Sequence, residues 1–271
     1  MDEHPISPAI RAEIISRLAA IEVEHGVRVL YACESGSRGW GFASPDSDYD
    51  VRFLYVHPLA WYLQVNPARD VIEVPISDVL DINGWELRKA LGLLMKGNAT
   101  LIEWLDSPVV YRADAVFLGA MRDAALDTHR PERSFHHYVH MARRNYREYL
   151  RGETVRLKKY LYVLRPLLAA LWIERGRGVA PMRFTALVDG IVTDAGLRMA
   201  IEQLLVAKRA AMESEVGPPL PAINAFVDAE LTRLEAAAPP ASDGIDFSVL
   251  DRLLSDTVLR LDAANSRTHS C

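Results

Sequence analysis

Two aspartates separated by a single residue follow a glycine–serine turn in the most informative stretch of this sequence. Asp48 and Asp50 flank Tyr49 at the start of a predicted strand, so their side chains point to the same side of it. Paired carboxylates suit Mg²⁺, which prefers oxygen ligands and is usually held by one or two carboxylates together with a substrate phosphate. The spacing therefore predicts a magnesium site.

The turn before these aspartates carries residues suited to a phosphate. Gly36 lets the backbone approach closely, and Ser37 opens a short predicted helix whose N–H groups can donate to an anion. Arg38 adds a guanidinium that can form a charge-assisted hydrogen bond with a phosphate oxygen. Gly36, Ser37 and Arg38 are therefore the first candidates for phosphate binding.

Other motifs that use similar residues do not match. An EF-hand calcium loop beginning at Asp46 requires glycine at its sixth position and glutamate at its twelfth, where this chain has Val51 and His57. The glycines form neither the GxGxxG dinucleotide motif nor a P-loop. The remaining alternative to a metal site is a solvated acidic turn.

The elements that must position these residues alternate between strands and helices up to about residue 125. A helix is expected to begin after Ser7 and to end at Gly26, and another to begin near Trp85, with Asn83 well placed as its N-cap. Strands are predicted at residues 27–33, 49–56, 70–75 and 79–82.

From residue 131 onward, most apolar residues recur at the spacing of an α-helix. This spacing covers residues 134–152 and 155–176, and Pro166 is expected to kink the second helix or to start a new one. We therefore predict an α+β protein. A domain built on a small mixed sheet should span residues 1–130, and a helical domain residues 131–271.

Charge is distributed unevenly along the chain, although its net value is only -5. Residues 1–130 carry 12 basic and 19 acidic side chains, residues 131–183 carry 12 and 4, and residues 184–271 carry 7 and 13. Exposed charges are screened beyond about 8 Å at physiological salt, so a partner responds to the local excess. The basic segment 131–183 is thus a candidate for binding an anion.

Basic and aromatic residues interleave in this segment, as on surfaces that bind single-stranded nucleic acid. Two stripes recur at helical spacing: Arg143, Arg147 and Arg151, and Lys158, Tyr162 and Arg165. Lys158 and Lys159 are the best candidates for contacts with a triphosphate. The alternative is an ordinary solvated helix face.

The segment GSRGWGFASPDSDYDVRF resembles the signature of the DNA polymerase β superfamily of nucleotidyltransferases. Together with DINGWELRKAL and VRLKKYLYVLRPLLA, it more closely resembles the predicted nucleotidyltransferases of the YcgL/RlaP type, over most of residues 25–175. The resemblance implies a polymerase β-like palm followed by a helical domain. It also implies transfer of a nucleoside monophosphate from an NTP, with ATP favoured, to a hydroxyl, using two Mg²⁺ ions or Mn²⁺ in their place.

Members of the superfamily use a third carboxylate on a later strand. Asp81, between two apolar residues, fits this position best, and Glu73 is the alternative. The resemblance then implies that Asp48, Asp50 and Asp81 are the catalytic residues and metal ligands. It also implies that Gly36, Ser37 and Arg38 bind the triphosphate.

The resemblance leaves the acceptor open. We expect an RNA end, in RNA repair or modification, because the basic helices favour a polyanion. The alternatives are a small molecule, a protein hydroxyl, or a catalytically silent module that only binds RNA or nucleotide. Asp48 and Asp50 argue against a silent module. Two neighbouring carboxylates repel each other, and a module without catalytic activity has no reason to keep them together.

A cytoplasmic location without a membrane partner is expected. No apolar stretch approaches the roughly 20 residues needed to cross a bilayer, and the N-terminal residues do not match a secretory signal. Cys33 and Cys271 are the two cysteines, and both are predicted to be reduced thiols.

Overall fold

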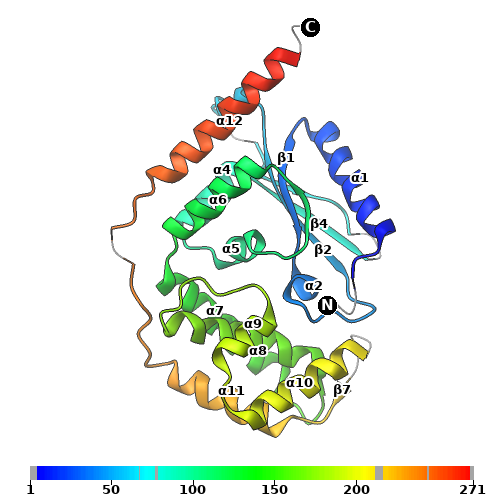
Figure 1. The fold of residues 1–271 in the computed structure, drawn as a ribbon, viewed down its shortest axis with the longest axis vertical. Coiled ribbons are helices and arrows are strands. Elements are labelled where there is room, and N and C mark those ends of the chain that lie inside the picture. The colour runs from blue at the N-terminus through cyan, green and yellow to red at the C-terminus, as the bar shows by residue number, and fades with distance from the viewer. Residues whose placement is uncertain (1–4, 67, 77–78, 211–215, 243, 269–271) are drawn as a thin grey trace. The chain divides into compact units, whose positions relative to one another are not determined.

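The computed structural model describes residues 5–66, 68–76, 79–210, 216–242 and 244–268, which form two compact units (Figure 1). The sheet unit comprises residues 5–36, 48–129 and 244–268, and the helical unit residues 37–47 and 130–242. Cys271 lies outside the described residues. The predicted α+β class is confirmed, with a mixed sheet and many helices.

This division differs from the predicted boundary at residue 130 in two segments. Residues 37–47 belong to the helical unit, because Trp40 and Phe42 pack against its aromatic side chains. Residues 244–268 belong to the sheet unit, where the last helix packs on an earlier one through Arg260 and Asp114. Neither packing partner is close in sequence, so local composition does not reveal it.

The sheet unit is built on five strands in the order β3-β4-β2-β1-β5. The β2 and β4 strands are parallel, and the other neighbouring pairs are antiparallel. The strands are β1 Arg28–Glu34, β2 Tyr49–Val56, β3 Val71–Glu73, β4 Leu80–Glu86 and β5 Val110–Ala113. Sequence analysis did not predict β5, a short strand at the edge of the sheet.

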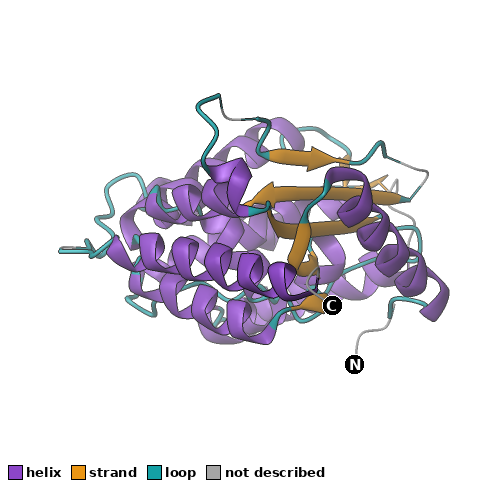
Figure 2. Ribbon diagram, turned by 90° about the horizontal axis from the view of Figure 1, so that it is seen from above, coloured by secondary structure: helices purple, strands orange, loops and turns teal. Residues whose placement is uncertain are grey.

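Helices cover both faces of this sheet, as the purple helices around the orange strands show in Figure 2. The helices of this unit are α1 Pro8–His25, α3 Leu59–Tyr62, α4 Leu87–Met95, α5 Ala99–Leu105, α6 Ala115–Asp127 and α12 Ser248–Thr268. Leu18 of α1 packs with Val51 and Phe53 of β2 in the core on one face. On the other face, Trp104 of α5 packs on Trp85 of β4, with ring centroids 4.0 Å apart.

Strand β4 continues beyond the predicted range, through Asn83 and Gly84 to Glu86. The helix N-cap predicted at Asn83 is therefore wrong, and Glu86 caps α4 by accepting a hydrogen bond from the backbone of Lys89. The glycine signals a close contact here, because a Cβ at residue 84 would lie 2.2 Å from the ring of Phe53.

The helical unit contains most of the remaining helices and one two-stranded sheet. Its elements are α2 Gly36–Trp40, which begins at the junction with the sheet unit, α7 Pro131–Tyr149, β6 Val155–Arg156, α8 Leu157–Glu174, α9 Phe184–Ile191, α10 Ala195–Ala210, β7 Val216–Gly217 and α11 Pro221–Arg233. Its core lies where α7 and α9 pack on α8.

Helix α8 runs through Pro166 as one helix, so the proline does not start a new one. Proline has no N–H for the carbonyl four residues earlier. That carbonyl belongs to Tyr162 and accepts a hydrogen bond of 2.9 Å from the side-chain amide of Asn145 on α7. The neighbouring helix therefore supplies the donor that the proline lacks.

The sequence predicted that no segment crosses a bilayer and that the cysteines are reduced thiols. Among the described helices, none combines the length and hydropathy needed to cross a bilayer. Cys33 is a free, buried thiol, and burial raises its pKa to about 12. It therefore stays protonated at neutral pH.

Candidate active site

Asp48 and Asp50 lie at the beginning of β2. Asp48 is exposed and directly precedes the first strand residue, and Asp50 is the second residue of the strand, with 30% of its side chain exposed. The backbone N–H of Tyr49 donates to the carbonyl of Val79, which ties the start of β2 to the chain entering β4. The paired aspartates therefore mark one end of the sheet.

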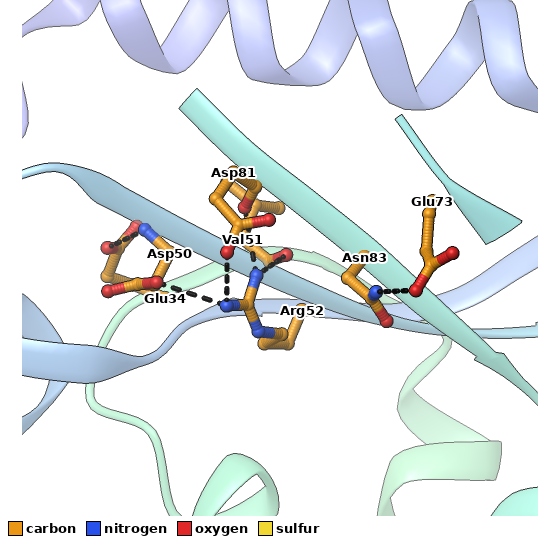
Figure 3. A network of polar contacts seen from close by, with 7 residues as sticks. All are labelled: Glu34, Asp50, Val51, Arg52, Glu73, Asp81 and Asn83. Atoms are coloured by element: carbon orange, nitrogen blue, oxygen red, sulfur yellow. Dashed lines mark hydrogen bonds and ion pairs between the residues drawn. The ribbon is translucent and has the colours of Figure 1, made fainter. Parts of the chain in front are cut away.

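Asp81 lies beside Asp50, because the parallel register of β2 and β4 pairs these two residues. Glu73 lies one strand further out, on β3 opposite Asn83, whose side-chain amide donates to it (Figure 3). Glu73 also forms an ion pair with Arg69. Of the two candidates for the third carboxylate, the structure therefore brings Asp81 to the aspartate pair and leaves Glu73 at the sheet edge.

The guanidinium of Arg52 lies between Asp50 and Asp81 (Figure 3). Its Nη2 donates to Oδ1 of Asp50 at 3.0 Å and to Oδ2 of Asp81 at 2.7 Å. Its Nη1 donates to the backbone carbonyls of Val51 and Asp81. Sequence analysis did not single out Arg52, although its position two residues after Asp50 on the same strand face was a usable signal.

A buried glutamate holds the backbone of Asp50. Glu34 ends β1 and is fully buried, and its Oε1 accepts a hydrogen bond of 2.8 Å from the N–H of Asp50. Its Oε2 accepts a hydrogen bond from the hydroxyl of Tyr111, and its carbonyl accepts one from Ser107. Sequence analysis missed Glu34, a charged residue at the end of an otherwise apolar strand.

Gly36 follows this strand and has a left-handed backbone, with φ of +58°. A Cβ at this position would lie 1.9 Å from Oδ2 of Asp50. The carboxylate of Asp50 therefore occupies space that only glycine leaves open, which gives Gly36 a steric role beside its predicted phosphate contact.

Ser37 and the ten residues that follow it are part of the helical unit. Trp40 and Phe42 pack edge-on against Tyr162 of α8, with ring centroids 5.6 Å and 6.4 Å away, and Phe42 also contacts Phe184 of α9. The ring of Trp40 therefore packs within the helical unit. The chain crosses between the units at both ends of the segment, directly beside Gly36 and Asp48.

Two cations hold the loop after α2. Arg38 is buried, and its Nη2 donates to the carbonyl of Ser47 at 2.7 Å. Lys208 of α10 is 2% exposed and donates to Oγ of Ser44 at 2.6 Å, while Ser44 and Ser47 bond each other. Nothing in the sequence near residue 208 signals this contact, because its partner is 164 positions away.

Two further arginines surround the same segment. The guanidinium of Arg165 lies 4.8 Å from the ring centroid of Trp40 and is buried, and Arg209 donates to the carbonyl of Gly41. Arg165 was predicted to lie on an exposed stripe of α8, and that expectation is wrong, since its face of the helix packs inward. Residues 37–47 are therefore held in a cluster of positive charge within the helical unit.

Lys158 and Lys159 lie in the first turn of α8 and are partly exposed. The ammonium of Lys159 lies 3.7 Å from the ring centroid of Tyr149 and 5.4 Å from that of Tyr162. An ammonium over aromatic faces keeps its charge while its stem is packed.

Two members of the predicted arginine stripe, Arg143 on α7 and Arg151 just after this helix, form ion pairs inside the helical unit. Arg143 lies 3.2 Å from Glu235, and Arg151 lies 3.6 Å from Asp228 of α11. Arg147 remains exposed on the same helix. Part of the positive charge counted in segment 131–183 is thus offset by carboxylates that come later in the chain.

The acidic residues at the start of β2 and β4 offer the oxygen ligands that a hard cation such as Mg²⁺ prefers. Asp48, Asp50 and Asp81 offer only carboxylate oxygens, and the steric gap at Gly36 leaves room for the carboxylate of Asp50. Within the described part of the chain, no group of three or more acidic, His or Cys side chains is arranged closely enough to hold a metal ion. A cation would therefore be held by the aspartate pair and completed by substrate oxygens, as is usual for Mg²⁺.

Comparison with known proteins assigns the chain to a family. The model of the RlaP family, described as the RNA repair pathway DNA polymerase beta family, matches residues 10–256. The chain belongs to the RlaP family. The predicted resemblance is therefore confirmed, and with it membership of a nucleotidyltransferase-like family.

A relative from Bacillus subtilis agrees with this assignment. The chain is 45% identical over 251 residues to the uncharacterized protein YcgL of Bacillus subtilis (strain 168), covering 92% of this chain and 96% of YcgL. Among solved structures, a nucleotidyltransferase-like protein from Exiguobacterium sibiricum 255-15 aligns with 82% of this chain and 73% of its own, at 13% identity and a TM-score of 0.30. The family assignment rests on the family model and on YcgL, which span nearly the whole chain.

Proposed function

We propose that this RlaP-family protein is a Mg²⁺-dependent nucleotidyltransferase that transfers a nucleoside monophosphate from an NTP to a hydroxyl of an RNA end. The observation that carries the proposal is the register of β2 and β4, which pairs Asp50 with Asp81 just after Asp48. Three carboxylates at one end of neighbouring strands suit a reaction in which negative charge must be neutralised and a proton removed.

In the proposed reaction, the acceptor hydroxyl oxygen forms a bond to the α-phosphorus of the NTP. The bond between this phosphorus and the oxygen bridging to the β-phosphate breaks, and pyrophosphate leaves with the electron pair. A carboxylate oxygen of Asp81 accepts the hydroxyl proton. Mg²⁺, held as two ions by the aspartates and the triphosphate, would supply the charge that offsets the leaving group and would lower the pKa of the hydroxyl.

We assign the triphosphate to Gly36, Ser37 and Arg38, with Lys158 and Lys159 as further contacts. The cluster of positive charge around residues 37–47 supports this assignment, because buried cations raise the local potential for an anion. ATP is the favoured NTP.

Two observations favour RNA as the acceptor. The description of the family names an RNA repair pathway, and the helical unit carries exposed arginines. Arg144 and Arg147 of α7 are exposed and so remain available to a polyanion, whereas Arg143 is paired with Glu235 and Arg151 with Asp228. Single-stranded nucleic acid binds such surfaces through phosphate contacts and stacking.

Label transfer tests this function directly. The full chain is incubated with Mg²⁺, an RNA mixture and one α-phosphate-labelled NTP at a time, and the labelled species are separated. Asp48→Asn and Asp50→Asn should each lower transfer by about 100-fold or more, because each removes a charge that offsets the triphosphate. Asp127→Asn, at the exposed end of α6, is the matched control and should leave transfer unchanged.

The position of the label separates the alternatives. Label on RNA supports the proposed acceptor, and label on a protein or a small molecule replaces it. If no NTP yields any labelled product, or if the wild-type protein transfers no more than the aspartate variants, the proposal of a nucleotidyltransferase is wrong.

A further inference from the structure

The Arg52 guanidinium is a cation that both paired carboxylates contact. Asp50 and Asp81 lie opposite each other on parallel strands, so their like charges would repel if nothing lay between them. The Nη2 atom of Arg52 donates to one oxygen of each. The site therefore holds its carboxylates together without any added ion.

The surroundings of Arg52 show that this contact is built into the sheet. Only 17% of its side chain is exposed, against 30% for Asp50 and 33% for Asp81. Its Nη1 is held by the carbonyls of Val51 and Asp81 at 3.0 Å and 2.9 Å. A guanidinium with both terminal nitrogens anchored in this way is a fixed charge, unlike a surface arginine.

The consequence concerns metal affinity. A fixed positive charge in contact with both carboxylates lowers their attraction for a divalent cation. A triphosphate adds both oxygen ligands and negative charge, and so compensates for this loss.

We propose that Arg52 is a built-in counter-ion of the metal site, which keeps the affinity of the free protein for Mg²⁺ low and makes metal binding depend on the nucleoside triphosphate. Arg52 acts through Asp50 and Asp81, so it is a positioning residue. The proposal rests on the proposed function for the identity of the nucleotide, and it extends that function to the order in which metal and nucleotide bind.

Mn²⁺ binding without nucleotide tests the proposal. We expect the wild-type protein to bind Mn²⁺ weakly and Arg52→Gln to bind it at least about tenfold more tightly, because the competing charge is gone. Arg52→Lys keeps the charge and should stay close to the wild type. Arg69→Gln is the matched control: it removes an arginine paired with Glu73 one strand away, and its affinity should not change.

A second measurement needs no variant. Adding a non-hydrolysable ATP analogue should tighten Mn²⁺ binding to the wild-type protein by about tenfold or more, through the added phosphate ligands. Circular dichroism establishes that each variant is folded, and Arg52→Met replaces Arg52→Gln if the latter is not.

The outcomes are distinct. Equal or weaker Mn²⁺ binding by the uncharged variant, an equal gain by Arg52→Lys, or tight binding by the wild-type protein without nucleotide would each overturn the counter-ion role. Label transfer with unchanged Mn²⁺ affinity in Arg52→Gln overturns this inference alone. Tighter Mn²⁺ binding by Arg52→Gln, together with no label transfer from any NTP by the wild-type protein, overturns the proposed function alone.

Discussion

At the scale of single residues, Gly36 and Glu34 place Asp50 without taking part in its chemistry. Glu34 accepts the backbone N–H of Asp50, and the absence of a side chain at Gly36 leaves room for its carboxylate. Arg52 then bonds that carboxylate from the side of β4. The position of one carboxylate thus depends on a buried acid, a glycine and a guanidinium.

Replacing Gly36 with alanine tests this dependence. The left-handed φ of +58° and the 1.9 Å approach to Asp50 should together lower the free energy of unfolding by about 1–3 kcal/mol. Displacing the carboxylate should also lower label transfer by about tenfold or more. Both quantities are measured, by chemical denaturation and by the transfer assay.

Gly26→Ala is the matched control. Gly26 has a φ of +59°, but a Cβ there would meet nothing within 4 Å. It should lose about 1 kcal/mol of stability and retain transfer. If both variants lose the same stability and both keep transfer, the steric role of Gly36 is wrong.

At the scale of elements, α7 and α8 are joined by a hydrogen bond that the proline of α8 makes necessary. The carbonyl of Tyr162, which is partly buried, would otherwise lack a donor, because Pro166 cannot provide the helical N–H. A buried acceptor left unpaired costs about 1–3 kcal/mol. Asn145 therefore stabilises the contact between α7 and α8 by donating a hydrogen bond to this carbonyl.

A double-mutant cycle measures this coupling. Asn145→Ala should lower the free energy of unfolding by about 1–3 kcal/mol in the wild type, because it leaves the Tyr162 carbonyl unpaired. In a Pro166→Ala background the same change should cost less, since residue 166 then donates its own N–H. Denaturation of the four proteins gives the coupling energy, and additive effects would contradict the explanation.

At the scale of the whole molecule, net charge is a poor guide to a polyanion site, and so is charge counted along the chain. The segment 131–183 contains 12 basic and 4 acidic residues. Within the helical unit, however, Asp228 of α11 and Glu235 just after that helix pair with two of these arginines. Asp228 also accepts the hydroxyl of Tyr146, and burial together with this bond raises the pKa of Tyr146 to about 12.

RNA binding should therefore depend on the exposed arginines of α7. Replacing Arg144 and Arg147 with alanine should weaken binding and lower the slope of log affinity against log salt by about 1.4, since each phosphate contact to a single strand contributes about 0.7. The salt series is measured by fluorescence anisotropy with a labelled single-stranded RNA. Replacing the paired Arg143 and Arg151 should change the slope less, and the reverse order would refute the assignment.

Much of the fold follows from local patterns. The alternation over residues 49–56 was enough to predict β2, because the side-chain period of a strand is set within a few residues. Ser7 and Gly26 likewise mark the two ends of α1 as predicted, since capping depends on adjacent backbone groups. The α+β class followed from the order of these elements.

Other features depend on residues that the sequence keeps far apart. Arg52 and Asp81 are separated by 29 positions, and Lys208 and Ser44 by 164. Such pairs meet only after the strands have taken their register and the helices have packed. Patterns along the chain therefore predict the aspartates and the family. The guanidinium between Asp50 and Asp81 and the pairing of α7 with α11 emerge instead from contacts that short-range periodicity does not encode.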